Sequence, residues 1–113
     1  MTDSCLFCRI AAGTLPATIV AESELAVAFR DLHPQAPVHV LVIPRVHVDS
    51  LAAASDAALL GDTLALAADV ARREGVADSG YRVVTNVGRD GGQSVGHLHL
   101  HVPVSYTHLT LPT

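Results

Sequence analysis

Three histidines alternate with apolar residues in the segment His-Leu-His-Leu-His-Val, which occupies residues 97–102. Alternate residues of an extended strand share a face, so the pattern places His97, His99 and His101 on one side. Successive histidines are then about 7 Å apart, and the outer pair about 13 Å. A metal ion bonds imidazole nitrogen at about 2 Å, so one straight strand cannot bring all three to one ion. The row therefore favours a nucleophilic site, and the alternatives are a three-histidine metal site and the solvated polar face of an edge strand.

A glycine-rich segment, Asn86-Val-Gly-Arg-Asp-Gly-Gly-Gln-Ser-Val-Gly96, comes directly before the histidine row. Glycine lets the backbone turn sharply and present N–H groups to an anion, and Gln93 and Ser94 add neutral donors. Such a loop is a weak signal alone. Imidazole is mostly unprotonated and nucleophilic near pH 7, because its pKa is about 6.5. Together, the loop and the histidines indicate a phosphate cradle beside a nucleophile.

Cys5 and Cys8 have the C-x-x-C spacing of metal ligands, which supplies half of a tetrahedral site. The other two ligands must be distant histidines, and His47 and His97 are the natural candidates. Two reduced, buried cysteines are the alternative. A disulfide is less expected in a reducing compartment, and no βαβ pattern supports a thioredoxin-like redox motif.

The expected secondary structure consists of short strands around one clear helix. Apolar residues at helical spacing predict the helix from Ser55, as N-cap, to Gly75 just past its end. A short helical turn over residues 4–11 carries both cysteines. Strands are predicted at Thr18–Glu22, Leu25–Arg30, Val38–Pro44, Tyr81–Val87 and Gly96–Val102. This order predicts an α+β fold with a five-stranded, mainly antiparallel sheet and the long helix on one face.

Composition excludes several classes of protein. The chain has 113 residues, half of them hydrophobic and 16% charged, which suits a single globular domain. The net charge of −4 and the absence of a basic run argue against a nucleic-acid duplex as partner. No apolar stretch reaches the roughly 18 residues of a membrane helix, and no secretory signal is present at the N-terminus. We expect a cytoplasmic protein that does not bind a membrane.

The segment GGQSVGHLHLHV resembles the signature of the histidine triad (HIT) family. Its form Asp90-Gly-Gly-Gln-Ser-Val resembles the bacterial Hint-like nucleoside phosphoramidase branch. The upstream sequence, from CLFCRIAAG to VLVIPRVH, is similar as well, so the resemblance covers about residues 4–102. It implies a homodimer of subunits that each have a five-stranded antiparallel sheet and one long helix. The helix over 55–75 and the strand over 81–87 are the expected interface.

The resemblance also implies a hydrolase that converts purine nucleoside 5′-phosphoramidates, or related acyl-nucleotides, to the nucleoside monophosphate. His99 would be the nucleophile and carry the nucleotidyl intermediate. The other catalytic residues would be His101, His39 and Ser94, and the substrate-binding residues Asp31, Phe29, Leu32, Asn86 and Gln93. Two alternatives stay open, a nucleotide-binding adaptor with incidental turnover and a diadenosine-polyphosphate hydrolase of a sister branch.

Some of these residues also have purely structural interpretations. Asp31 is compatible with a turn before Pro34, Asn86 with a cap at a strand end, and Phe29 and Leu32 with the core. For Cys5, Cys8, His47 and His97, the resemblance implies a structural zinc site, and it implies no catalytic cofactor.

The last ten residues, Val-Ser-Tyr-Thr-His-Leu-Thr-Leu-Pro-Thr, do not resemble the family. They match an in-frame translation of a transposase-type sequencing adapter. We expect residues 1–103 to form a single HIT domain and 104–113 to be a non-native tail, with the natural C-terminus missing.

Overall fold

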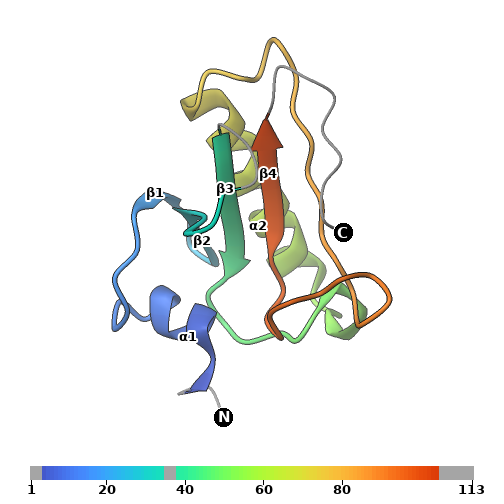
Figure 1. Cartoon of the computed structure of the whole chain (residues 1–113). Coiled ribbons are helices and arrows are strands. Elements are labelled where there is room, and N and C mark those ends of the chain that lie inside the picture. Colours follow the sequence, from blue (N-terminus) through green and yellow to red (C-terminus); the bar gives the residue numbers. More distant parts are fainter. Residues whose placement is uncertain (1–3, 35–37, 105–113) are drawn as a thin grey trace.

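The computed structural model describes residues 4–34 and 38–104 and shows a four-stranded antiparallel sheet (Figure 1). The strands are β1 (Ile19–Glu22), β2 (Ala26–Arg30), β3 (Val38–Pro44) and β4 (Leu100–Val104), and they lie in that order across the sheet. The helices are α1 (Leu6–Ala11), the 3₁₀ turn η2 (Leu51–Ala53) and α2 (Ala57–Arg73). The predicted α+β fold, with an antiparallel sheet, one long helix and a short N-terminal helix, is confirmed.

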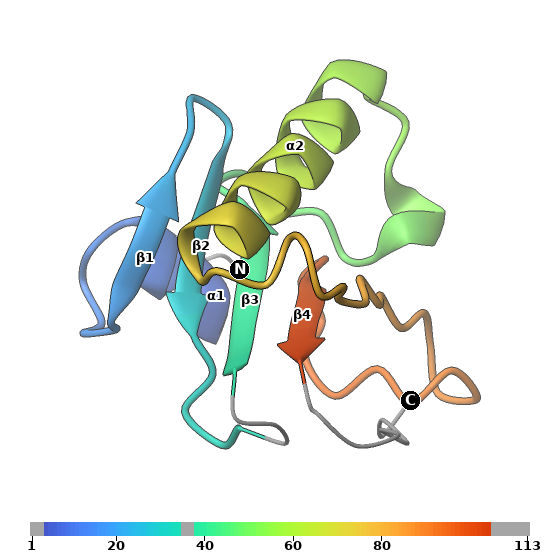
Figure 2. The same ribbon diagram turned by 90° about the horizontal axis from the view of Figure 1, so that it is seen from above.

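Helix α2 lies across one face of the sheet (Figure 2). Its buried Leu66, Ala67 and Val70 pack against small and β-branched residues of the four strands. The helix begins one residue later than predicted, because Asp56 rather than Ser55 caps it: Asp56 Oδ1 accepts hydrogen bonds from the N–H groups of residues 58 and 59. Its C-terminal end matches the prediction, since Gly75 has a φ of 75° directly after the last turn.

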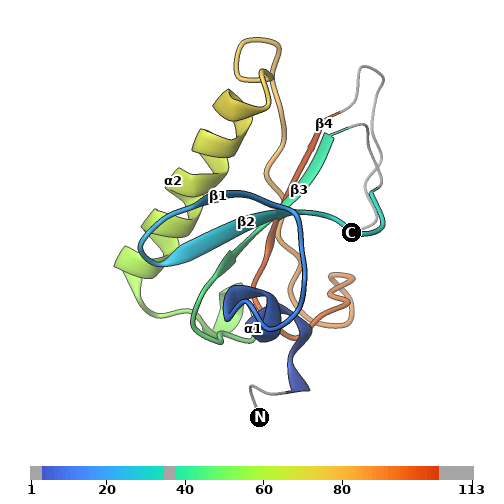
Figure 3. The same cartoon turned by 90° about the vertical axis from the view of Figure 1, so that its left-hand side faces the viewer.

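The opposite face of the sheet is covered by α1 (Figure 3). Alternate residues of β2 and β3 belong to two separate apolar clusters, as a two-sided sheet requires. On the α1 side, Phe7 and Ile10 pack against Val27, Phe29, Leu41 and Ile43. The central strands are therefore buried on both faces, and α1 forms part of the core.

The predicted fifth strand, Tyr81–Val87, is reduced to one β-bridge. This segment runs beside β4 in Figure 1, but only Val84 pairs with His101, through reciprocal backbone hydrogen bonds of 3.0 and 2.7 Å. The neighbouring carbonyl of His99 instead accepts a hydrogen bond from the Thr85 hydroxyl, at 2.8 Å. A side chain therefore replaces the backbone group that would have continued the ladder.

The predicted last strand, Gly96–Val102, is shifted toward the C-terminus. Residues 95–97 form a bend, and β4 begins at Leu100 and continues to Val104, which pairs with Val38. The Leu98 N–H donates to the carbonyl of Val48 at 2.6 Å, so the backbone before β4 follows residue 48. Val104 thus lies in the sheet, although the proposed tail was predicted to begin there. The remainder of that tail, 105–113, lies outside the described residues.

No helix in the described part of the chain is both long and apolar enough to cross a membrane.

Candidate functional site

His99 is buried, with 3% of its surface exposed, and one of its ring nitrogens has a fixed partner. Its Nδ1 lies 2.7 Å from the carbonyl oxygen of His97. A carbonyl only accepts hydrogen bonds, so Nδ1 carries the proton and donates it. The neutral tautomer then leaves Nε2 with its lone pair available, which is the state that a nucleophile requires.

A chain of polar groups continues from His99 along the sheet. The rings of His99 and His101 lie edge to face with centroids 5.0 Å apart. His101 Nδ1 shares a hydrogen bond of 3.0 Å with His39 Nε2, which is 3.5 Å from the Asp31 carboxylate. The antiparallel register between β3 and β4 places residue 39 opposite residue 103, so the two histidines meet diagonally across the strands. The structure thus brings together four of the predicted site residues.

Burial keeps the two flanking histidines uncharged. It lowers the pKa of His39 below its usual 6.5, and the nearby Asp31 carboxylate only partly opposes this. Burial also lowers the pKa of His101, to about 4, with further lowering by His99 and His39. At pH 7 both rings are therefore neutral, and the hydrogen bond between them holds a single proton.

A pocket of about 280 Å³ opens beside these groups. Its polar lining consists of Asp31, His33, His39, Ser94, His99 and His101, and its apolar lining of Leu6, Phe7, Ile10, Phe29, Leu32, Leu41 and Val95. Seven residues predicted for the site therefore line one cavity. The wall formed by α1 was not predicted. The apolar residues at i, i+1 and i+4 in LFCRI were the available signal, since they mark one face of a helix.

Asn86 and Gln93 do not line this pocket but brace the loop beside it. The Asn86 side chain donates to the Gly91 carbonyl at 2.9 Å. Gln93 donates to the carbonyls of Asp49 and Val95 and accepts from the Gly88 N–H. Asn86 is thus held within the loop rather than at the end of a strand, and the predicted phosphate contacts of both residues stay predictions.

A second cluster lies at the other end of the site and combines Cys5, Cys8, His47 and His97. Their ligand atoms all lie within 4.8 Å of one another. The Cys5 and Cys8 sulfurs are 3.3 and 3.5 Å from His97 Nδ1, and Cys8 Sγ is 3.3 Å from His47 Nδ1. Usual bond lengths to tetrahedral zinc give a sulfur–nitrogen separation of about 3.6 Å. The four residues could therefore hold a metal ion such as zinc.

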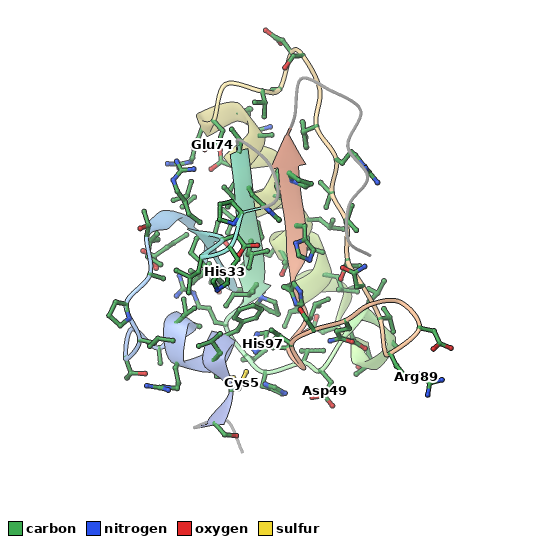
Figure 4. The ribbon with its side chains drawn as sticks, in the orientation of Figure 1. Cys5, His33, Asp49, Glu74, Arg89 and His97 are labelled. Carbon is green, nitrogen blue, oxygen red and sulfur yellow. The ribbon has the colours of Figure 1, made fainter. Side chains whose placement is uncertain are left out.

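The two histidines of this cluster are oriented by hydrogen bonds from their other nitrogens. His47 Nε2 lies 2.7 Å from the Asp49 carboxylate, and His97 Nε2 lies 3.0 Å from the Pro44 carbonyl (Figure 4 labels Cys5, Asp49 and His97). Both acceptors place the proton on Nε2, so each Nδ1 lone pair faces the cysteine sulfurs. Sequence reasoning missed Asp49, for which the His-x-Asp spacing was the only signal.

Without a metal, the Cys8 thiol of this cluster is hard to ionise. Burial, together with the hydrogen bond and charge of Cys5, raises the pKa of Cys8 from 9.0 to about 11. A coordinated cation reverses this effect, because it stabilises the thiolate directly. The cluster is therefore suited to a cation rather than to free thiolates.

Comparisons with known proteins give a consistent result. The HIT domain family matches residues 12–108. The chain is 44% identical to Protein HitA of Neisseria gonorrhoeae, over 88% of this chain and 94% of that protein. It is 38% identical to the purine nucleoside phosphoramidase of Escherichia coli strain K12, over 90% of this chain and 87% of that protein. The crystal structure of a HIT family hydrolase from Legionella pneumophila Philadelphia 1 is 44% identical, with a TM-score of 0.88 over 96% and 98% of the two chains.

The neutral state of His101 makes a prediction about acid stability. Its lowered pKa means that the unfolded chain binds more protons between pH 6.5 and 4, so stability is lost as the pH falls through that window. Relative to pH 7, the titration of His101 should lower the free energy of unfolding at pH 4 by roughly 2 kcal/mol, which is less than the full shift gives because the ring is only partly buried. We expect the free energy of unfolding of His101→Asn, measured by denaturant titration, to fall less steeply than that of the unsubstituted chain. His33→Asn is the control on an exposed histidine, and equal slopes for all three chains would contradict the assignment.

Proposed function

The chain belongs to the HIT family, and from that premise we propose that it hydrolyses purine nucleoside 5′-phosphoramidates or related acyl-nucleotides to nucleoside monophosphates. The observation that carries the proposal is the hydrogen bond from His99 Nδ1 to the His97 carbonyl, which leaves Nε2 unprotonated beside the pocket. The likeness to the Escherichia coli phosphoramidase supports the substrate class.

In the proposed reaction, His99 Nε2 attacks the α-phosphorus and the P–N bond to the leaving amine breaks. The departing nitrogen takes up one proton from solvent and leaves as the amine, and the nucleotide stays bound to Nε2. Water then attacks the same phosphorus and gives up one proton to solvent, the bond to Nε2 breaks, and the nucleoside monophosphate is released, so that the net reaction consumes one water molecule. The Nδ1–H of His99 remains bonded to the His97 carbonyl, which stabilises the positive charge that the ring gains when Nε2 is phosphorylated.

The proposed substrate contacts follow the lining of the pocket. Asp31 would accept hydrogen bonds from the ribose hydroxyls, and its Oδ1 already accepts from the His33 N–H at 2.9 Å. Phe29 and Leu32 would wall the purine. Ser94 would contact the phosphate and the leaving group. The hydrogen bonds of Gln93 and Asn86 would hold the loop that carries Ser94 in position. His39 and His101 would control where the protons reside.

The central test is hydrolysis of adenosine 5′-phosphoramidate by the His99→Ala variant. Removing a covalent nucleophile should lower kcat/KM by at least about 1,000-fold. Rapid quenching of the unsubstituted chain should trap a nucleotide on the peptide that contains His99, detected by mass spectrometry. Arg89→Ala, on an exposed loop residue, is the control and should keep full activity.

Three outcomes would replace the proposal. Full activity of His99→Ala excludes a nucleotidyl-histidine mechanism. Tight binding of adenosine 5′-monophosphate with negligible turnover indicates a nucleotide-binding adaptor. A preference for diadenosine polyphosphates in a substrate panel indicates the sister branch.

We also propose that the Cys5, Cys8, His47 and His97 cluster binds zinc in a structural role. A reducing cytoplasm would keep the two cysteines from forming a disulfide and so leave both sulfurs available to the metal. The Asp49 carboxylate should strengthen this site by orienting His47. Asp49→Asn should therefore weaken zinc binding by about 10-fold, measured by competition with a chromophoric chelator. Asp90→Asn is the control on an exposed loop. Equal affinities, or failure of the unsubstituted chain to retain zinc, would count against the site.

The implied homodimer is supported by exposed apolar side chains on α2 and along residues 81–87. Leu64 is 52% exposed, and Tyr81, Val83 and Val87 are 39–40% exposed. These side chains would lose their contact with water in a dimer. Light scattering of the chain at micromolar concentration should report a dimer, and Val83→Lys should shift it toward monomer. Ile19→Lys, on the β1 edge, is the control, and a monomeric unsubstituted chain would refute the interface.

A further inference from the structure

Helix α1 belongs to both sites at once. Cys5 is its N-cap and Cys8 lies within it, so α1 carries two of the four residues of the metal cluster. Leu6, Phe7 and Ile10 of the same helix line the pocket. We propose that a metal ion in the cluster fixes α1 as a wall of the nucleotide pocket, so that metal and nucleotide binding strengthen each other. This inference rests on the proposed function, which assigns the nucleotide to the pocket.

The helix has little stability of its own. It has six residues, whereas isolated helices shorter than about 12–15 residues are marginal in water. What holds α1 in place is the apolar contact of Phe7 and Ile10 with the sheet and, at its N-terminal end, the cysteines. The Cys5 sulfur accepts a hydrogen bond from the Cys8 N–H at 3.4 Å. A metal ion that binds both sulfurs therefore restrains the N-terminal end of a helix whose other anchors are the apolar contacts of Phe7 and Ile10.

Phe7 connects the two sites within this helix. Its ring contacts His97 of the cluster edge-on, with centroids 5.9 Å apart, and His99 of the pocket in the same way at 5.2 Å. It also contacts Phe29, the proposed purine wall, at 5.5 Å. A displacement of α1 consequently alters the packing of the nucleophile, a metal ligand and the base wall together. We assign Phe7 the role of a positioning residue.

His97 provides a second connection. Its Nδ1 belongs to the metal cluster, while its carbonyl oxygen accepts the hydrogen bond that fixes the His99 tautomer. Its side chain is fully buried and is held from the far side by the Pro44 carbonyl. The residue that would bind the metal is thus also the residue that orients the nucleophile.

Two ligands that order the same element are coupled reciprocally. If metal binding has already ordered α1, the nucleotide binds more tightly, and the nucleotide must strengthen metal binding by the same factor. Such couplings are typically about 5- to 150-fold. We expect a factor of at least about 5 here, because α1 forms an entire wall of the pocket.

The experiment is a complete binding cycle on the full chain, with zinc and adenosine 5′-monophosphate as probes. Calorimetry gives the nucleotide affinity of chelator-stripped protein and of protein loaded with one equivalent of zinc. Competition with a chromophoric chelator gives the zinc affinity with and without saturating nucleotide. The ratio of the nucleotide affinities with and without zinc should equal the ratio of the zinc affinities with and without nucleotide, and both ratios should exceed about 5. Circular dichroism of the stripped chain should show that the sheet and α2 remain folded.

Phe7→Leu tests the assigned connection, because it keeps an apolar side chain but removes the ring contacts with His97 and His99. It should still bind zinc and should lower this ratio toward 1, while the connection through His97 and the contacts of Leu6 and Ile10 remain. Leu59→Ala is the matched control, a buried residue of α2 that lines neither site. It should lower the free energy of unfolding and leave the ratio intact. A ratio unchanged in Phe7→Leu would overturn the role of Phe7.

The remaining outcomes separate this inference from the proposed function. If zinc and nucleotide both bind but the ratios equal 1, the coupling is overturned and the proposed function stands. If the stripped chain unfolds as a whole, the coupling belongs to global folding and α1 is not its carrier. If neither form binds the nucleotide, the proposed function fails and the coupling fails with it.

Discussion

His99 donates from Nδ1 to the carbonyl oxygen of His97, and this 2.7 Å hydrogen bond depends on where the chain departs from a regular strand. In a continued β-ladder, that carbonyl would point to a neighbouring strand, and the side chains of His97 and His99 would lie on one face. Instead the backbone bends at residues 95–97, and Leu98 follows Val48. The bend releases the carbonyl for the ring of His99 and lets the side chain of His97 turn toward the cysteines. The histidine row is thus divided between two kinds of chemistry.

The sheet is covered on both faces, and its second cover, α1, also reaches both groups of histidines. Burial on the α2 side alone would leave Val27, Phe29, Leu41 and Ile43 in contact with water. Helix α1 covers them through Phe7 and Ile10, and it lies close enough for Phe7 to touch the rings of both His97 and His99. Covering the core and forming the site are therefore one packing arrangement.

Local sequence patterns predicted what depends on local structure. The β-branched, apolar run over 38–44 gave β3 the same bounds, Val38–Pro44, and β2 was predicted to within one residue. The triad spacing and the cysteine pair identified residues that the structure does place in two clusters. The fifth strand failed because its pairing is decided by the Thr85 hydroxyl, a contact between residues 14 positions apart in the sequence. The α1 wall was missed because only tertiary packing shows that this helix lines the pocket, whereas the contact of Asp49 with His47 is local and was signalled only by a His-x-Asp spacing.

The pocket lining contains few groups that could carry a positive charge, which makes the neutral hydrogen-bond donors of the glycine-rich loop important. The sequence contains no lysine, and no arginine occurs among the described residues that line the pocket. Since burial keeps His39 and His101 neutral, the proposed function relies on neutral donors, such as backbone N–H groups and the Ser94 hydroxyl, to stabilise the phosphate. Gly91 shows how tightly the loop is folded, because a Cβ there would lie 2.3 Å from the Val87 carbonyl oxygen. Neutral donors bind an anion without the strong attraction of a buried ion pair, so under the proposed chemistry the nucleotide product can leave a site that still stabilises it during reaction.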